Sequence, residues 1–161
     1  MPSNILVIGA TSAIAQAYAR REAAGGAHVF LVARDAARLE TISADLRVRG
    51  AGAVHSAVLD VVDDAAQDRV LDAAWAALGR VDVALLAHGT LPDQARCEAD
   101  PAYARAEFET NGGATIALMT RLAPIRDAAP AIWPFVEDVI EEAFTTGRYG
   151  APYPWEEQPA T

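Results

Sequence analysis

Residues 5–15 read Ile5-Leu-Val-Ile-Gly-Ala-Thr-Ser-Ala-Ile-Ala15, and this stretch decides the fold. It passes from a short apolar run through Gly9 and small residues into a helical pattern that continues to Arg20. Such a pattern predicts a strand, a tight turn and the first turn of a helix. The turn lets the backbone approach a pyrophosphate closely, and the helix N-terminus offers unpaired N–H groups to it. The stretch therefore predicts a nucleotide-binding strand–turn–helix unit.

The same alternation of strand and helix continues beyond this unit. The predicted strands span residues 4–8, 28–33, 53–59 and 81–87, and the predicted helices between them span residues 12–24, 36–49 and 64–78. Continuous apolar runs without alternation are typical of parallel strands that are buried on both faces. The pattern predicts an α/β fold with a Rossmann-like, doubly wound parallel sheet, and right-handed crossovers would give the strand order 3-2-1-4.

The chain after Gly89 is predicted to be helical and then irregular. Helical spacing covers residues 101–111 and 113–122, and Pro124 marks a shift in composition. Residues 135–144 place apolar side chains on one side and acidic ones on the other, which predicts an amphipathic helix. Residues 145–161 are rich in Gly, Pro and aromatic residues and predict an extended tail. We expect one dinucleotide-binding domain over residues 1–123, with residues 124–161 packed on it.

Composition narrows the classes of partner. The chain has 161 residues, is 52% hydrophobic and carries a formal net charge of −9, which argues against a nucleic-acid or anionic-membrane partner. No apolar run approaches the roughly 20 residues of a membrane span. Cys97 is the one cysteine, so a disulfide framework is excluded. Together with the lack of a leader-like N-terminus, this predicts a cytoplasmic location. The histidines at 28, 55 and 88 lack metal-ligand spacing, so no metal site is expected.

Gly9, Thr11 and Ser12 are the candidate phosphate contacts in the first turn. A side chain at Gly9 would obstruct a phosphate, although a plain turn also favours glycine there. The two hydroxyls can donate to a phosphate, and either can instead cap the helix. This loop resembles the Thr-Gly-x-x-x-Gly-x-Gly loop of the short-chain dehydrogenase/reductase family. The resemblance implies that Ala13 and Ile14 also contact the cofactor, with alanine at 13 and 15 in place of the second and third glycines.

Arg34 and Asp35 follow the second strand, where this class of fold reads the ribose of the cofactor. An acidic residue there binds a free 2′-hydroxyl, whereas an arginine accommodates a 2′-phosphate. Arg34 can form a bidentate contact with a phosphate, and Arg38 lies one helical turn further on. These residues predict NADP rather than NAD. The alternatives are a solvated Arg34 and an Asp35 that caps the next helix.

The other strand ends extend the resemblance. Asp60 and Val61 resemble the family's Asp-Val pair beside the adenine, which implies that Asp60 accepts from the adenine amino group; Asp60 can also cap the next helix. His88 and Gly89 stand where the family has the end of Asn-Asn-Ala-Gly, and His88 is either a ribose contact or a loop histidine without a role. The resemblance implies that Asn111 is the family's structural and proton-relay asparagine. Asn-Gly-Gly at 111–113 can also interrupt a helix.

The resemblance stops at the catalytic residues. In the family a serine acts with a tyrosine and a lysine in the pattern Tyr-x-x-x-Lys, but this chain contains no lysine, and Tyr153 stands where the lysine would follow Tyr149. A tyrosine with an ordinary pKa near ~10 is a poor base at neutral pH. We therefore expect an NADP(H)-binding oxidoreductase relative with impaired turnover of a small carbonyl or alcohol substrate. The alternative is a non-catalytic scaffold or regulatory protein. An open apolar edge of the sheet predicts self-association into a homo-oligomer.

Overall fold

The computed structural model describes residues 2–123 of the chain. The predicted helix at 135–144, the predicted tail and the two tyrosines at 149 and 153 lie outside the described residues. So does the expected packing of residues 124–161 on the first domain.

One parallel sheet organises the described residues. Its strands are β1 (Asn4–Ile8), β2 (His28–Ala33), β3 (Ala53–Val58) and β4 (Val83–Leu86), in the order β3-β2-β1-β4. In the register of the ladder, Ile5 of β1 lies opposite Val29 of β2 and Val83 of β4. The Rossmann-like topology and the predicted order are thus confirmed. β3 and β4 are slightly shorter than the apolar runs that predicted them.

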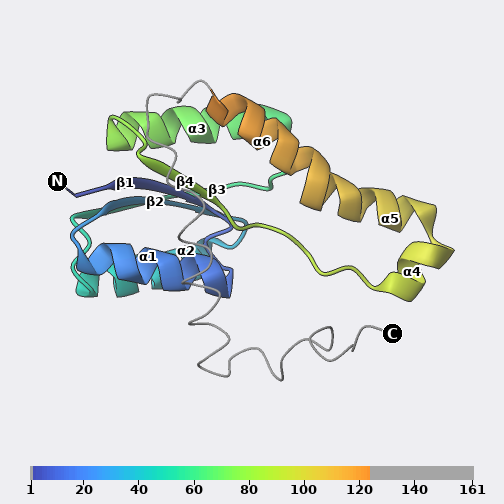
Figure 1. Cartoon of the computed structure of the whole chain (residues 1–161), viewed down its shortest axis with the longest axis horizontal. Helices are drawn as coiled ribbons and strands as arrows, with labels where there is room; N and C mark the ends of the chain where they lie inside the picture. Colours follow the sequence, from blue (N-terminus) through green and yellow to red (C-terminus); the bar gives the residue numbers. More distant parts are fainter. Residues whose placement is uncertain (1, 124–161) are drawn as a thin grey trace, which may run out of the picture. The chain divides into compact units, whose positions relative to one another are not determined.

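Helices cover both faces of the sheet. α1 (Ala13–Ala24) and α2 (Ala36–Val48) lie on one face, and α3 (Asp64–Leu78) and α6 (Ala114–Leu122) lie on the other (Figure 1). The first three begin at residues whose side chains accept a backbone N–H three positions on; these are Ser12, Asp35 and Asp63. Each cap satisfies one of the N–H groups that a helix leaves unpaired at its start.

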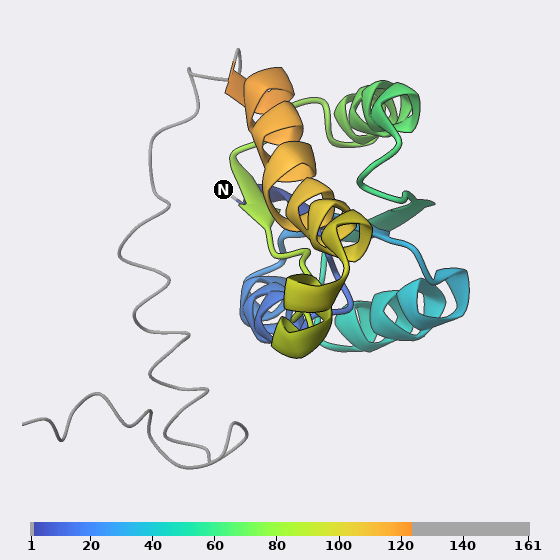
Figure 2. The same ribbon diagram turned by 90° about the vertical axis from the view of Figure 1, so that its right-hand side faces the viewer.

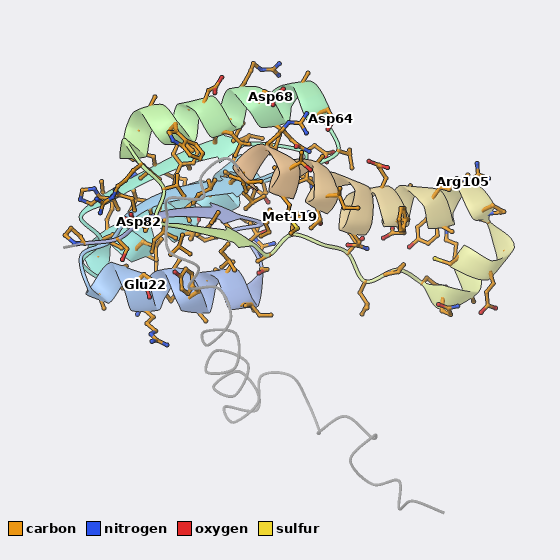
Figure 3. The ribbon with its side chains drawn as sticks, turned by 45° about the horizontal axis from the view of Figure 1, so that its top comes forward. Glu22, Asp64, Asp68, Asp82, Arg105 and Met119 are labelled. Atoms are coloured by element: carbon orange, nitrogen blue, oxygen red, sulfur yellow. The ribbon has the colours of Figure 1, made fainter. Side chains whose placement is uncertain are left out.

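The core lies on both sides of β1, whose residues Ile5 to Ile8 are at most 1% exposed. On the α3 side, Leu6 and Ile8 pack in a cluster with Leu71 and Leu118. Ion pairs at the surface add to this contact, because Arg121 Nε lies 2.7 Å from Asp68 Oδ1 and its Nη1 lies 3.5 Å from Asp64 Oδ1. Figure 3 shows both aspartates on α3 beside α6. This packing holds α6 against α3.

The segment between β4 and α6 differs from its prediction. It forms α4 (Gln94–Ala99), which sequence patterning missed, and α5 (Pro101–Phe108), which continues through the π-helical turn η1 (Glu109–Gly113) into α6. Figure 2 shows this end of the molecule. Asn-Gly-Gly therefore widens the helix for one turn and does not interrupt it. Glycine suits both positions in this turn, since a Cβ on Gly112 would lie 3.3 Å from the Phe108 ring and one on Gly113 would meet the Glu109 carboxylate.

Candidate functional site

A cavity of about 270 Å³ opens at the carboxyl ends of the four strands. Its lining includes seven of the residues that the sequence nominated, namely Gly9, Thr11, Ser12, Arg34, Val61, His88 and Gly89. The carboxyl ends of parallel strands are where folds of this type bind ligands. Four candidates, Ala13, Ile14, Asp60 and Asn111, do not line it.

Gly9 directly follows β1 and lies against the backbone that follows β4. Its φ is +85°, and a Cβ there would lie 2.3 Å from the His88 nitrogen and 2.5 Å from the Ala87 carbonyl carbon. The N–H groups of Gly9 and Ala10 both donate to the Val32 carbonyl, at 2.9 and 3.0 Å. Sequence reasoning gave obstruction of a phosphate as the reason for this glycine. The structure supplies another reason, which is that two backbones meet here.

The N-terminus of α1 supplies hydrogen-bond donors beside Gly9. Ser12 Oγ accepts from Ala15 N at 3.0 Å, and the Ser12 carbonyl accepts from Gln16 N. The N–H groups of Ala13 and Ile14 have no protein acceptor within residues 2–123. These two residues would therefore act through their backbone. Ser12 caps the helix and keeps its hydroxyl proton for a further acceptor.

Arg34 and its neighbours form the β2 side of the cavity. Arg34 is exposed and forms no hydrogen bond or ion pair with any other described residue. Asp35 Oδ1 accepts from Arg38 N at 3.0 Å and caps α2, so the capping interpretation of Asp35 is confirmed. Arg38 Nη2 donates to the Thr11 carbonyl at 3.2 Å and joins α2 to the β1–α1 loop. A guanidinium without a protein partner beside unpaired N–H groups suits an anion.

The β3 side is apolar where it lines the cavity. Leu59 and Val61 contribute to the wall and are 2% and 7% exposed. Asp60, between them, is exposed and accepts from Val62 N at 3.4 Å. Asp63 rather than Asp60 caps α3.

His88, at the end of β4, is bonded to the helix above it. Its Nε2 lies 3.1 Å from Thr115 Oγ1, and Thr115 Oγ1 donates to the Asn111 carbonyl at 2.9 Å. His88 Nδ1 is buried without a hydrogen-bond partner among the described residues. Burial lowers the pKa of His88, and the Thr110 backbone opposes this in part. The imidazole is therefore neutral at pH 7.

Asn111 clamps the segment after β4. Its Oδ1 accepts from Thr90 N at 2.8 Å, and its Nδ2 donates to the Thr90 carbonyl at 3.1 Å and to Thr90 Oγ1 at 3.2 Å. The Thr90 hydroxyl donates in turn to Glu107. All hydrogen-bonding groups of the Asn111 amide face Thr90, which lines the cavity, so Asn111 shapes the site without lining it.

Comparison with known proteins identifies the family to which the chain belongs. The sequence model of the short chain dehydrogenase family matches residues 3–129. The chain belongs to this family. An uncharacterized oxidoreductase of Mycobacterium tuberculosis is 41% identical over 119 residues, which are 74% of this chain and 47% of that protein. The chain thus spans about half the length of that relative.

Solved dehydrogenase structures share the fold. An actinorhodin polyketide ketoreductase with NADPH is 27% identical, with a TM-score of 0.69 over 76% of this chain and 47% of its own. A metagenomic short-chain oxidoreductase in complex with NADP is also 27% identical, with a TM-score of 0.69 over 76% of this chain and 56% of its own.

In the part of the chain that the structure describes, no group of three or more His, Cys, Asp and Glu side chains could hold a metal ion. No helix in residues 2–123 is long and apolar enough to cross a membrane.

Sequence reasoning missed six lining residues of this cavity, which are Val32, Ala33, Leu59, Ala87, Thr90 and Thr110. The first four stand at or just past the carboxyl ends of predicted strands, so their position was a usable signal. Thr90 follows Gly89 and was within reach of the same argument. Thr110 reaches the cavity because η1 widens the helix beside β4, and no local pattern predicts that approach.

Proposed function

We propose that this chain binds NADP(H) in the cavity at the carboxyl ends of its strands. The observation that carries the proposal is a set of donors without protein partners in the described residues: the Arg34 guanidinium, which lines the cavity, and the N–H groups of Ala13 and Ile14, which follow the lining residue Ser12 at the start of α1. Hydrogen-bond donors left unpaired beside a cavity suit an anionic ligand. The NADP(H) in the two dehydrogenase structures described above supports this choice of anion.

In this proposal each wall takes one part of the cofactor. The pyrophosphate lies against the N–H groups at the start of α1, with Thr11 and Ser12 donating their hydroxyl protons. Arg34 binds the 2′-phosphate, which distinguishes NADP from NAD. Val61 packs against the adenine, and the exposed Asp60 carboxylate accepts from the adenine amino group. His88 and Gly89 adjoin the nicotinamide ribose.

We further propose that the 161-residue chain turns over small carbonyls or alcohols near the background rate. A bound nicotinamide would supply or take up a hydride. The chain has no lysine to lower the pKa of a tyrosine or to hold the ribose, and acid–base assistance is typically worth ~10²–10⁴-fold. A steady-state assay with saturating NADPH over a panel of ketones, aldehydes and secondary alcohols tests this. Robust turnover that is abolished in Tyr149→Phe or Tyr153→Phe would overturn it.

Calorimetric titration with NADPH and with NADH tests the binding itself. Micromolar binding of NADPH, and weaker binding of NADH, is the expected result. Binding of neither nucleotide would favour the second candidate function, a non-catalytic scaffold or regulatory protein, for which the absence of lysine is the specific observation.

Self-association is the remaining part of the proposal. Among the described strands β4 lies at an edge of the sheet, and Phe108, Ile116 and Met119 expose 69%, 63% and 57% of their surface on the nearby helices. Apolar surface of this kind favours association with a second copy. Sedimentation at increasing concentration measures it, and a monomer at every concentration would contradict it.

A further inference from the structure

Gln67 is a polar side chain that is completely buried. It lies in the second turn of α3, is 0% exposed, and has the core residues Val70 and Leu71 next along its helix. A buried amide costs free energy unless its groups are hydrogen-bonded. The partners of this side chain therefore indicate why an amide stands at this position.

One half of the Gln67 amide has a partner and the other half does not. Nε2 donates to the Val61 carbonyl at 2.7 Å. Because a carbonyl oxygen can only accept, the NH2 group must face Val61. Oε1 is buried with no hydrogen-bond partner in residues 2–123. The fold thus bears the cost of one unsatisfied acceptor while it keeps the bond to Val61.

Val61 stands in the turn that joins β3 to α3. Leu59 N donates to the Ala33 carbonyl at 3.0 Å, and Asp63 N donates to the Asp60 carbonyl at 3.0 Å, so both sides of Val61 are fixed. The Val61 carbonyl between them is held by Gln67. Val61 lines the cavity, whereas Gln67 does not. The amide therefore acts on the cavity through the peptide of Val61.

We propose that Gln67 is a positioning residue that sets the Val61 wall against the adenosine end of the bound nucleotide. This rests on the proposed binding of NADP(H). Without the amide donor, the Val61 carbonyl would be buried without a partner, and its peptide would rotate toward water. That rotation moves the Val61 side chain, while the donors at the start of α1 and at Arg34 stay in place. The loss should fall on adenosine binding alone.

The first test compares Gln67→Leu with the wild-type 161-residue chain by calorimetry. The ligands are NADP+ and adenosine 2′,5′-bisphosphate, which keeps the adenosine end and lacks the nicotinamide. We expect the dissociation constants of both to rise by the same factor, about tenfold, as the loss of one neutral hydrogen bond allows. Leu78→Ala is the matched control, because Leu78 is a core residue at the far end of α3. It should lower thermal stability and leave both dissociation constants unchanged.

The second test uses Gln67→Glu and does not depend on how Gln67→Leu folds. Burial raises the pKa of a carboxyl group, so the glutamic acid is neutral at low pH and donates to the Val61 carbonyl as the amide does. At higher pH the carboxylate repels that carbonyl. The ratio of variant to wild-type dissociation constants for NADP+ should therefore be near one at pH 5.5 and rise by about tenfold or more toward pH 8.5.

The outcomes separate this inference from the proposed function. Failure of the wild type to bind NADP+ overturns the proposed function. Wild-type binding with an unchanged Gln67→Leu overturns the inference alone, and so does an equal loss in Leu78→Ala. A ratio for Gln67→Glu that is constant with pH also overturns it.

Discussion

Two walls of the same cavity use their polar groups in opposite ways. The phosphate wall consists of Gly9, Thr11, Ser12 and Arg34, and the first two residues of α1 adjoin it. The β4 wall consists of residues 88–90 and Thr110, to which Asn111 and Thr115 are bonded without lining the cavity. Arg34 and the N–H groups of Ala13 and Ile14 have no protein partner among the described residues. On the β4 wall, Thr90 is bonded directly to Asn111 and to Glu107, and His88 is linked to the Asn111 carbonyl through Thr115.

The difference separates groups that wait for a ligand from groups that hold the protein together. Unpaired donors cost little while water solvates them, and they form charge-assisted bonds when an anion arrives. Bonded groups have already gained that free energy in folding. Substitutions on the phosphate wall should therefore change binding, and those on the β4 wall should change stability.

The largest effect is expected where the two walls touch. Gly9→Ala places a methyl group 2.3 Å from the His88 nitrogen at a φ of +85°. Left-handed strain of ~1–2 kcal/mol and overpacking of ~1–3 kcal/mol predict a loss of about 2–5 kcal/mol in the free energy of unfolding. Urea denaturation measures it. Gly79→Ala is the control, since Gly79 has a φ of +73° and open space around it, and should show only the strain. Equal losses at the two positions would contradict the close approach.

Arg34→Ala tests whether the phosphate wall serves binding rather than stability. Removing a charge-assisted contact of ~1.5–3 kcal/mol should weaken NADPH about ten- to a hundredfold and leave NADH nearly unchanged. Stability should change by less than ~0.5 kcal/mol, because Arg34 is exposed and unpartnered within the described residues. Calorimetry with both nucleotides tests this. Arg105→Ala, an exposed arginine on α5 (Figure 3), is the control. An unchanged ratio of the two affinities would show Arg34 to be a surface arginine.

Asn111→Ala, on the β4 side, should change stability rather than nucleotide binding. It leaves Thr90 N, which now donates to Asn111 at 2.8 Å, without this acceptor. Since the site is exposed and water replaces part of the bond, we expect a loss of ~1 kcal/mol in unfolding free energy. Asn111→Asp keeps the acceptor and loses the donors, so it should lie between alanine and wild type. Denaturation curves that match wild type for both variants would rule out a structural clamp.

The smallest expected effect is the contribution of His88 to the pH dependence of stability. Burial lowers the pKa of the folded imidazole below its ordinary 6.5, so the unfolded chain binds this proton more readily. The contribution of His88 is therefore complete above pH 6.5 and declines as the pH falls below that value toward the folded pKa. In His88→Gln, stability should fall less steeply over this interval. Identical slopes in the wild type and in His88→Gln would refute the assignment.

Local patterns predicted the elements that make up the sheet and the first three helices. β1, β2 and α3 have the predicted bounds at both ends, because apolar runs, capping aspartates and glycines lie directly at those ends. Segments whose contacts are distant in sequence were harder to predict. α4 was missed because its six residues carry no apolar periodicity, and the π-helical turn η1 was not predicted, because interruption of a helix was the only local alternative that Asn-Gly-Gly suggested.

The sequence by itself determined the topology and the seven nominated residues that line the cavity, because the order of strands and the residues at their ends are local properties in a parallel sheet. Tertiary structure alone decided what those residues do to one another. A Cβ added at Gly9 would meet the backbone of His88. Asn111 is hydrogen-bonded to Thr90, and Gln67 is hydrogen-bonded to Val61. The contacts of Gly9 and Asn111 join residues 79 and 21 positions apart, and even the six-residue span of Gln67 depends on a turn geometry. Such contacts follow from packing in three dimensions, which local residue patterns do not encode.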